Sequence, residues 1–309
     1  MNTNQNEKKP AAGRSGIVAV VGRANTGKST LVNCILEEKI SIVSPVAQTT
    51  RNVIRGVLTE PRGQMVFLDT PGIHKAESEL GKIMNRSARA STGGTDVILM
   101  VFDASRPPRD EDEGWMRRAI FETVPVVAVL NKTDEPEDCS GRYLDRWHEL
   151  EKEKSVQKDI PWLRTSALQN SGVRELVDLL FDRLPEGPHL FPDDVLTDFP
   201  RKLAIADIIR EKLFHRLREE LPHSVAVTVD TFDEAADGNW DIKCTIYVNR
   251  HSQKAIVIGE KGRLLRSVRL SSQKEIKAIY DHPVNLTLWV KVEPNWAKNF
   301  WLLKKLGYQ

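Results

Sequence analysis

The sequence has few cysteines and no long apolar run, and both features exclude classes of protein. No apolar stretch approaches the roughly 18–20 residues that a transmembrane helix needs. Residues 1–15 are polar and contain no hydrophobic core of a secretory signal, so we interpret them as a disordered lead-in. The three cysteines, Cys34, Cys139 and Cys244, are far apart and form no C-x-x-C pair. This pattern argues against disulfides and a zinc site, and it favours the reducing cytosol.

The net charge is small, but its distribution along the chain is uneven. The 309 residues carry a formal net charge of +2. Residues 1–200 contain 26 basic and 30 acidic residues, whereas residues 201–309 contain 19 basic and 13 acidic ones. Basic regions attract polyanions. We therefore expect two domains, of which the second binds any polyanionic partner.

A phosphate-binding loop stands near the start of the chain. Residues 22–29 read G-x-x-x-x-G-K-S, after the apolar run 17–21 and before a stretch of helical character. Glycines let backbone N–H groups wrap a phosphate, and the helix N-terminus adds positive potential. In this motif Lys28 reaches the β- and γ-phosphates, and the Ser29 hydroxyl ligates Mg²⁺. The residues expected to contact the nucleotide here are Gly22, Asn25, Thr26, Gly27, Lys28, Ser29 and Thr30.

The first two-thirds of the chain alternates expected strands and helices. Nearly unbroken apolar runs at 65–68, 97–102 and 124–130 are typical of parallel strands that are covered on both faces. Helical stretches are expected at 81–90, 110–121, 142–153 and 173–184. The pattern predicts a doubly wound α/β domain, in which ligands bind at the carboxyl ends of the strands.

Three further motifs follow expected strands. Asp69 and Gly72 come from a D-x-x-G, in which the aspartate holds Mg²⁺ through water and the glycine N–H meets the γ-phosphate. Asn131, Lys132 and Asp134 form an N-K-x-D. An ionised aspartate only accepts hydrogen bonds, so it matches the N1–H and N2–H₂ donors of guanine and not the N1 acceptor of adenine.

The last nucleotide motif follows a short strand that ends near Leu163. A backbone N–H of Ser166, Ala167 or Leu168 is expected to meet the guanine O6. The order of the four motifs predicts a site for GTP or GDP with Mg²⁺.

These residues resemble the translation-factor-related GTPases. Residues 40–52 resemble the first switch of that group, in which a threonine closes onto Mg²⁺ in the GTP state. The resemblance favours Thr50 as that residue, with Thr49 second, and implies a second switch over 69–84. Lys28, Thr50 and Gly72 then carry the catalytic roles.

The resemblance also bears on which group positions the attacking water in GTP hydrolysis. Small regulatory GTPases orient the attacking water with a Gln after the D-x-x-G, but here that position is Ile73. Water must then be positioned by the backbone, by Thr50 or by a partner, and we expect slow unaided hydrolysis. Asn25 resembles the residue that helps to hold K⁺ in related GTPases, although Ala24 replaces the usual proline before it.

Residues 185–200 contain four prolines and predict a linker without regular structure, between a GTPase domain at 16–184 and a second domain at 201–309. The second domain begins with a helix whose apolar residues repeat at 205, 209, 213 and 217. Alternating strands at 225–229, 242–248 and 284–292, and a helix with Leu265, Val268, Ile276 and Ile279 on one face, complete an α-β-β-α-α-β order.

A G-x-x-G at 259–262 lies between the two helices that follow the hairpin. This placement resembles the KH domain in its three-stranded prokaryotic topology, whose glycine loop approaches a nucleic-acid backbone. Residues 250–274 contain seven Lys or Arg against one acid, which predicts phosphate contacts. The expected RNA-binding residues are Lys254, Gly259, Glu260, Lys261, Gly262, Arg263 and Arg266. Trp289, Trp296 and Trp301 are interpreted as packing residues.

Over residues 17–309 the chain resembles the Era family of bacterial ribosome-assembly GTPases, which join a GTPase to a KH domain. The resemblance implies binding near the 3′ end of small-subunit ribosomal RNA and help in assembling the 30S subunit in the cytoplasm. Peripheral contact with the cytoplasmic membrane is left open. Glu260 inside the loop, and Arg269 where a glycine is usual, depart from the family pattern.

Two alternatives compete with this interpretation. The first is an RNA-binding scaffold that holds nucleotide with negligible turnover, against which Lys28, Ser29, Thr50 and Asp69 argue. The second is a membrane- or division-associated GTPase without an RNA ligand, which the basic segment 250–274 disfavours.

Overall fold

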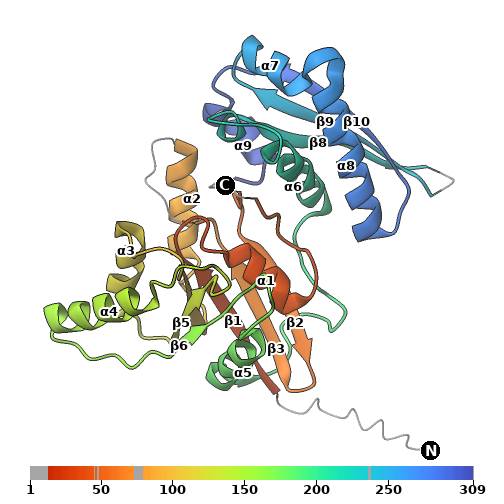
Figure 1. Cartoon of the computed structure of the whole chain (residues 1–309). Helices are drawn as coiled ribbons and strands as arrows, with labels where there is room; N and C mark the ends of the chain where they lie inside the picture. The colour runs from red at the N-terminus through yellow and green to blue at the C-terminus, as the bar shows by residue number, and fades with distance from the viewer. Residues whose placement is uncertain (1–12, 45, 47–48, 73–78, 236–237, 309) are drawn as a thin grey trace, which may run out of the picture.

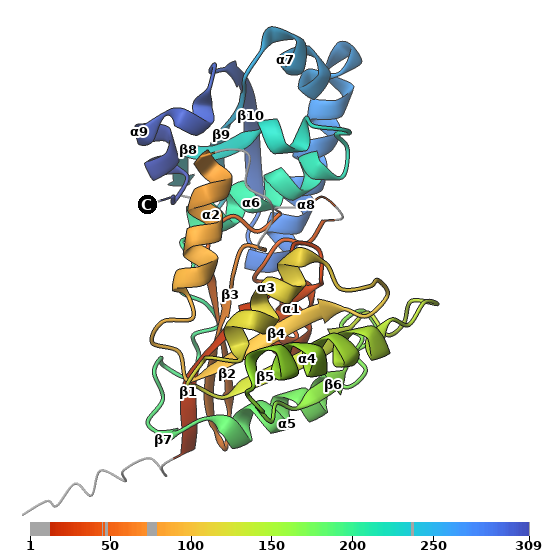
Figure 2. The same ribbon diagram turned by 90° about the vertical axis from the view of Figure 1, so that its left-hand side faces the viewer.

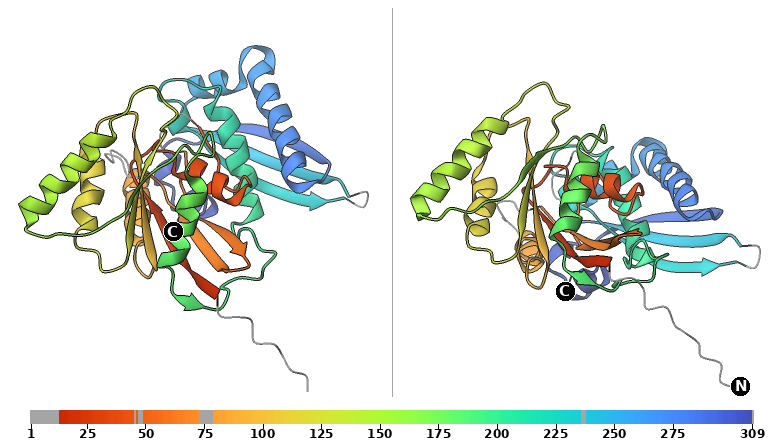
Figure 3. Two further views of the ribbon diagram at one scale, coloured as in Figure 1. Left: turned by 60° about the horizontal axis from the view of Figure 1, so that its bottom comes forward. Right: turned by 90° about the horizontal axis from the view of Figure 1, so that it is seen from below.

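The first part of the protein is a mostly parallel sheet between two helical layers (Figures 1 and 3). The computed structural model describes residues 13–44, 46, 49–72, 79–235 and 238–308. The strands lie in the order β2-β3-β1-β4-β5-β6, with β7 pairing β1 and only β2 and β7 antiparallel to their neighbours. Their bounds are β1 Gly13–Val21, β2 Ile54–Glu60, β3 Gly63–Asp69, β4 Val97–Asp103, β5 Val126–Asn131, β6 Trp162–Arg164 and β7 Glu186–Gly187.

The helices cover both faces of this sheet because the central strands are apolar on both sides. Val18 and Val20 of β1 pack under α1 and α5, whereas Ala19 and Val21 pack under α3 and α4. The helices of this part are α1 Lys28–Leu36, α2 Glu79–Ala90, α3 Asp110–Ala119, α4 Ser140–Lys154 and α5 Val173–Arg183. The predicted doubly wound α/β architecture is confirmed.

Three features of this part differ from the sequence prediction. β2 was not predicted; it pairs antiparallel with β3 through a tight turn at residues 60–63. β1 includes the last three residues of the expected lead-in, because Gly13 and Arg14 pair with β7. Residues 1–12 of that lead-in lie outside the described residues.

The linker is held against the GTPase part and is not free of regular structure, since it begins with β7. The side-chain oxygen of Gln64 accepts hydrogen bonds from the backbone N–H groups of Leu190 and Phe191, both at 2.8 Å. The backbone N–H of Val57 donates to the carbonyl of Leu196 at 2.8 Å. Leu190 and Phe191 thus supply the N–H donors that the neighbouring prolines lack, and Leu196 supplies a carbonyl.

The second part has the predicted α-β-β-α-α-β order and one extra C-terminal helix. Its sheet has the order β10-β9-β8, with β9 and β10 parallel and β8 and β9 antiparallel. Its elements are α6 Arg201–Phe214, η1 Pro222–Ser224, β8 Ala226–Glu234, β9 Trp240–Val248, α7 His251–Ile258, η2 Glu260–Gly262, α8 Arg263–Tyr280, β10 Val284–Val292, η3 Trp296–Lys298 and α9 Phe300–Lys305. Residues 236 and 237 of the expected turn lie outside the described residues.

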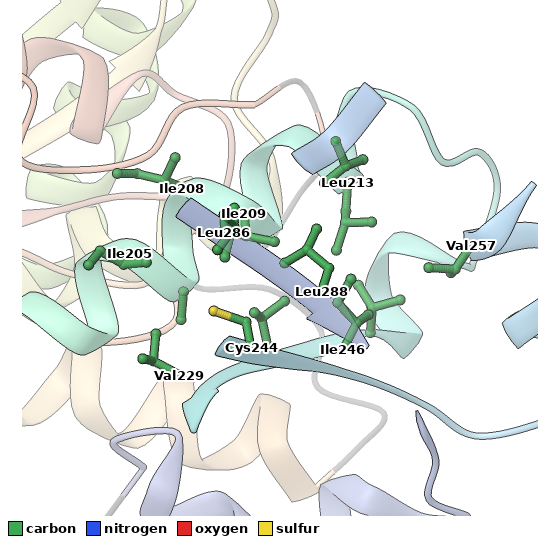
Figure 4. Packing of buried hydrophobic residues seen from close by; sticks show 14 of the residues in the cluster. Ile205, Ile208, Ile209, Leu213, Val229, Cys244, Ile246, Val257, Leu286 and Leu288 are labelled. Atoms are coloured by element: carbon green, nitrogen blue, oxygen red, sulfur yellow. The ribbon is translucent and has the colours of Figure 1, made fainter. Parts of the chain in front are cut away.

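One apolar cluster joins the helices to one face of this sheet (Figure 4). Ile209 and Leu213 of α6 meet Cys244 and Ile246 of β9 and Leu288 of β10 in this cluster. Of the residues predicted for the apolar face of α8, Ile279 is instead 40% exposed and lines a pocket together with residues 38–42 and 196–199.

Helix α6 was predicted to be amphipathic, but it is buried on nearly every side. Asp207, Arg210 and Glu211 are each at most 5% exposed. One face packs on the KH-type sheet, while these charged residues turn towards residues 39–51 of the GTPase part. The helix therefore lies between the two parts of the molecule.

A second contact joins α2 to the C-terminal segment (Figure 2). Leu80 and Met84 of α2 share a buried cluster with Trp296 and Leu306. Among the described residues, no helix is long and apolar enough to cross a membrane.

Candidate nucleotide site and nucleic-acid interface

The phosphate-binding loop has the backbone that its sequence predicts. Asn25 has φ 65° and Gly27 has φ 93°, and Gly27 precedes the first residue of α1. Lys28 Nζ donates hydrogen bonds to the carbonyls of Arg23 at 2.8 Å and Gly22 at 3.2 Å. Burial lowers the pKa of Lys28 to about 8. A buried ammonium at the centre of a ring of backbone groups is suited to an anionic ligand.

The residues predicted to bind Mg²⁺ lie together beside this loop. Ser29 Oγ and Thr50 Oγ1 are 2.8 Å apart. Asp69 is fully buried, and neither carboxylate oxygen has a hydrogen-bond partner of good geometry. Burial raises the pKa of Asp69, although the Ser29 and Ser41 hydroxyls and the charge of Lys28 oppose that shift. Two hydroxyls and an unsatisfied carboxylate form an oxygen donor set of the kind that Mg²⁺ uses together with phosphate and water.

The same segment decides between the two candidate threonines. Thr49 Oγ1 donates to the carbonyl of Val46 at 2.6 Å and lies in the turn. Thr50, by contrast, contacts Ser29. Gly72 approaches the loop so closely that a Cβ atom would lie 2.5 Å from Ala24 Cα, so only glycine fits there.

Asn131 connects the loops of the base site. Its Nδ2 donates to the carbonyl of Thr26 at 3.0 Å, and its Oδ1 accepts from Thr165 Oγ1 at 3.2 Å and Ala167 N–H at 3.1 Å. The Ala167 N–H is therefore already used within the protein. The Ser166 N–H is also used, since it donates to the carbonyl of Ser171 at 3.0 Å, and we therefore propose the N–H of Leu168 for guanine O6.

The carboxylate expected to read the base is positioned by a neighbouring loop. Asp134 Oδ1 accepts a hydrogen bond from Ser166 Oγ at 2.5 Å. Lys132 Nζ lies 2.6 Å from Asp103 Oδ2, so this ion pair links the loop after β5 to the end of β4. Ser166 thus has a clear role in orienting Asp134. Thr30 lies in the first turn of α1 and lines the same cleft as the loop.

Several predicted positions lie in or beside segments outside the described residues. These are Ile73 and the rest of 73–78 in the second switch, and residues 45, 47 and 48 in the first. The potassium role of Asn25 stays a prediction; Asn25 is exposed on the rim of the cleft that Thr49 and Thr50 also line.

The glycine loop of the second part has the geometry of a backbone-binding turn. Gly259 has φ 74° and Gly262 has φ 75°, and a Cβ atom on Gly262 would meet no atom within 4 Å. Lys261 between them is exposed with φ 50°. Glu260 Oε2 lies 3.8 Å from Arg263 Nη1, with both side chains about three-quarters exposed, so Arg263 partly offsets the acidic charge in the loop.

A groove of about 390 Å³ extends from this loop along α8 and β10. Arg266 and Arg269 line it together with Gly262. Lys254 lies on α7 and is not among the residues that line this groove. Arg269, at a position where the family pattern usually has a glycine, therefore adds positive charge to the groove.

Comparison with known proteins decides the family. A family model described as 50S ribosome-binding GTPase matches residues 17–132, and a KH domain model matches residues 220–297. The chain is 44% identical over 298 residues to GTPase Era of Geobacter sp. (strain M21), covering 96% of this chain and 98% of that protein. The chain belongs to the Era family of GTPases. GTPase Era of Heliobacterium modesticaldum is 40% identical over the same length.

Solved Era structures have the same overall arrangement. A variant of Aquifex aeolicus Era bound to GDP·AlF4⁻ matches with a TM-score of 0.87 at 37% identity, covering 96% of this chain and 99% of that one. Era in complex with MgGDPNP and nucleotides 1506–1542 of 16S ribosomal RNA matches with a TM-score of 0.88 at the same identity and coverage. The predicted GTPase and KH folds of this Era-family chain are thus confirmed.

Sequence reasoning did not identify the residues that join the first switch to the KH part. Arg51, directly after Thr50, is 3% exposed and donates to the carbonyl of Val225 at 3.0 Å. Its guanidinium lies 5.8 Å from the ring centres of Phe214 and Trp296. We call this set the Arg51 socket. The resemblance included the Thr-Thr-Arg triplet, but no local pattern indicated where the arginine is buried.

An ion network makes a second connection. Lys39 Nζ lies 2.7 Å from Glu211 of α6 and 2.6 Å from Glu275 of α8. Glu211 also accepts a hydrogen bond from the backbone N–H of Val43 at 3.1 Å. Burial alone would raise the pKa of Glu211, but hydrogen bonds from Lys39 and Lys212 hold it below its ordinary value. The network therefore stays charged at neutral pH.

Proposed function

We propose that this chain is a Mg²⁺-dependent GTPase switch of the cytoplasm that binds small-subunit ribosomal RNA and assists assembly of the 30S subunit. The proposal is carried by one observation: Thr50 contacts Ser29 of the phosphate loop while the next residue, Arg51, is buried in the KH part. A single short segment of backbone therefore connects the nucleotide site to the RNA-binding domain.

The residues of the nucleotide site have separate tasks. Lys28 and the loop N–H groups bind the phosphates, and Gly72 approaches close enough for its N–H to meet the γ-phosphate. Ser29, Thr50 and Asp69 are the oxygen donors that fit Mg²⁺, which when bound offsets the negative charge of the phosphates. Asp134 selects guanine, and Ser166 orients it.

Hydrolysis in this proposal depends on groups other than a catalytic glutamine. Thr50 contacts Ser29 of the phosphate loop, so its backbone is suited to position water. Asn25 lies on the open rim of the loop, where K⁺ would add positive charge near the transferred phosphate. We propose that K⁺ has this role.

RNA binding is supported by the groove and by the family. One Era protein binds nucleotides 1506–1542 of 16S ribosomal RNA, and this chain has the same fold and a groove lined by Arg266 and Arg269. We therefore propose that the KH part binds the 3′-terminal region of the same RNA. Peripheral membrane contact is the competing alternative, and binding to vesicles distinguishes it from RNA binding.

The coupling between nucleotide and RNA follows the α6 side of the KH part. The described residues of the first switch contact α6, Val225 and α8 at Glu275. They do not line the groove. We propose that closure of the switch changes the positions of α6 and α8, and so moves the wall of the groove that α8 forms.

The RNA part of the proposal is tested with two variants of one residue. Gly262→Asp and Gly262→Asn place side chains of nearly equal size at the same positive φ, and asparagine tolerates that backbone. Only the aspartate adds negative charge where phosphates approach. We expect Gly262→Asp to lose RNA binding and Gly262→Asn to retain most of it, measured by fluorescence anisotropy with single-stranded RNA. If both variants bind RNA like the wild type, the groove is not the RNA site.

A further inference from the structure

Three aromatic side chains of the KH part are exposed. Trp289 is 66%, Phe300 69% and Trp301 76% exposed, whereas Trp296 is 1% exposed. The sequence interpretation of these tryptophans as packing residues is therefore confirmed for Trp296 and wrong for the other two. Phe300 and Trp301 are in contact, with ring centroids 5.6 Å apart, and contiguous exposed apolar groups are typical of an interaction surface.

These residues lie near the open face of the KH sheet. Leu288 lines the RNA groove, and Trp289, the next residue of β10, points to the opposite face because side chains alternate along a strand. Tyr247 on β9 packs in the same cluster as Leu302 of α9. Figure 2 shows α9 on the other side of this sheet from α8. Trp289 faces the same side as Tyr247 and α9, because Lys291, two residues further along β10, pairs with Tyr247.

The surface around these aromatic residues is basic. No acidic residue occurs from 294 to 308, and Lys298, Lys304 and Lys305 are all exposed. Two acids nearby are neutralised, since Lys305 pairs with Asp230 at 2.7 Å and Lys291 pairs with Glu293 at 3.1 Å. Lys298 and Lys304 form no ion pair with another described residue, so they supply uncompensated positive charge.

We propose that Trp289, Phe300, Trp301, Lys298 and Lys304, here named the aromatic-basic face, bind RNA that continues from the groove. Unpaired bases stack on the exposed rings and phosphates contact the lysines. A KH loop clamps only about four nucleotides, so a longer RNA needs a further surface. The edge of β10 is the shortest route from the groove, because Leu288 and Trp289 are adjacent. The inference rests on the proposed RNA binding.

The test uses the full chain and two RNAs. The short RNA is a single strand of about four nucleotides, the length that a KH loop clamps, and the long RNA extends the same strand at both ends. The double variant Trp289→Ala, Trp301→Ala should bind the long RNA at least tenfold more weakly than the wild type, and the short RNA equally well. Phe121→Ala is the matched control, because Phe121 is 64% exposed on the GTPase part.

A second variant keeps the test valid if the tryptophan variant fails to fold. The double variant Lys298→Gln, Lys304→Gln removes two expected phosphate contacts. The slope of log affinity against log salt concentration should therefore become shallower by about 1.4 for the long RNA, because each contact to a single strand contributes roughly 0.7. Equal binding of the long RNA by wild type and both variants would overturn the inference. So would loss of binding to anionic phosphatidylglycerol vesicles without loss of RNA binding, which would indicate a membrane surface. If the wild type binds neither RNA, the proposed function itself fails.

Discussion

Replacement of Arg51 by methionine tests whether the first switch controls RNA binding. Methionine retains an unbranched apolar stem against Phe214 and Trp296, but it removes the charge and the hydrogen bond to the Val225 carbonyl. We define the coupling ratio as the RNA affinity of the GTP-bound chain divided by that of the GDP-bound chain. In the variant we expect this ratio to fall towards one. The overall fold should persist, because much of the packing remains.

The size of the effect follows from the contacts in the Arg51 socket. A hydrogen bond from a charged donor contributes about 1.5–3 kcal/mol, and a buried cation–π contact contributes up to about 2 kcal/mol. Burial opposes these gains, as the lowered pKa of Arg51 indicates. A net contribution of about 2 kcal/mol corresponds to a roughly 30-fold change in affinity, within the usual range for coupled sites.

The assay is RNA affinity of the full chain loaded with GDP or with a non-hydrolysable GTP analogue. Arg55→Met is the matched control, since Arg55 is about half exposed and pairs with the exposed Asp198. Thr50→Ala should also reduce the ratio of affinities by releasing the switch. A wild-type ratio in the Arg51→Met variant would refute the reasoning about the socket. If the ratio of RNA affinities is unchanged in Thr50→Ala, the coupling must instead be carried by the second switch.

Three further predictions concern the nucleotide site. GTP and GDP should bind far more tightly than ATP, and Asp134→Asn should shift preference towards xanthine nucleotides, as competition binding will measure; comparable ATP affinity would remove the guanine assignment. Turnover at fixed Mg²⁺ should be slow and faster in K⁺ than in Na⁺, and Asn25→Ala should abolish that difference; equal rates for the wild type in both salts would exclude the potassium role. Because the pKa of Lys28 is about 8 and a bound phosphate raises it, GTP binding should take up a proton and weaken about tenfold from pH 7 to pH 9. Calorimetry in buffers of different ionisation enthalpy will measure that uptake, and pH-independent affinity would contradict it.

Much of the site could be predicted because its signals are local. A glycine loop before a helix, and short polar motifs directly after apolar strands, need only a few consecutive residues to be identified. The structure brings Ser29, Thr50 and Asp69 together as that reasoning required. β2 was missed because Gly56 and Arg55 interrupt its apolar pattern, and its pairing with β3 depends on a turn.

The sequence by itself determined the α/β domain, the KH domain and the positions of the nucleotide motifs. The periodicity of apolar residues specifies the helices and strands, and short local motifs specify the nucleotide site. Only the tertiary structure decided that Thr50 and not Thr49 contacts the phosphate loop, that Arg51 is buried under the KH part, and that Trp289 is exposed. These outcomes depend on contacts between residues far apart in the chain, such as Arg51 with Val225. A local pattern shows which face of an element is apolar, but what covers that face depends on the packing of the whole chain.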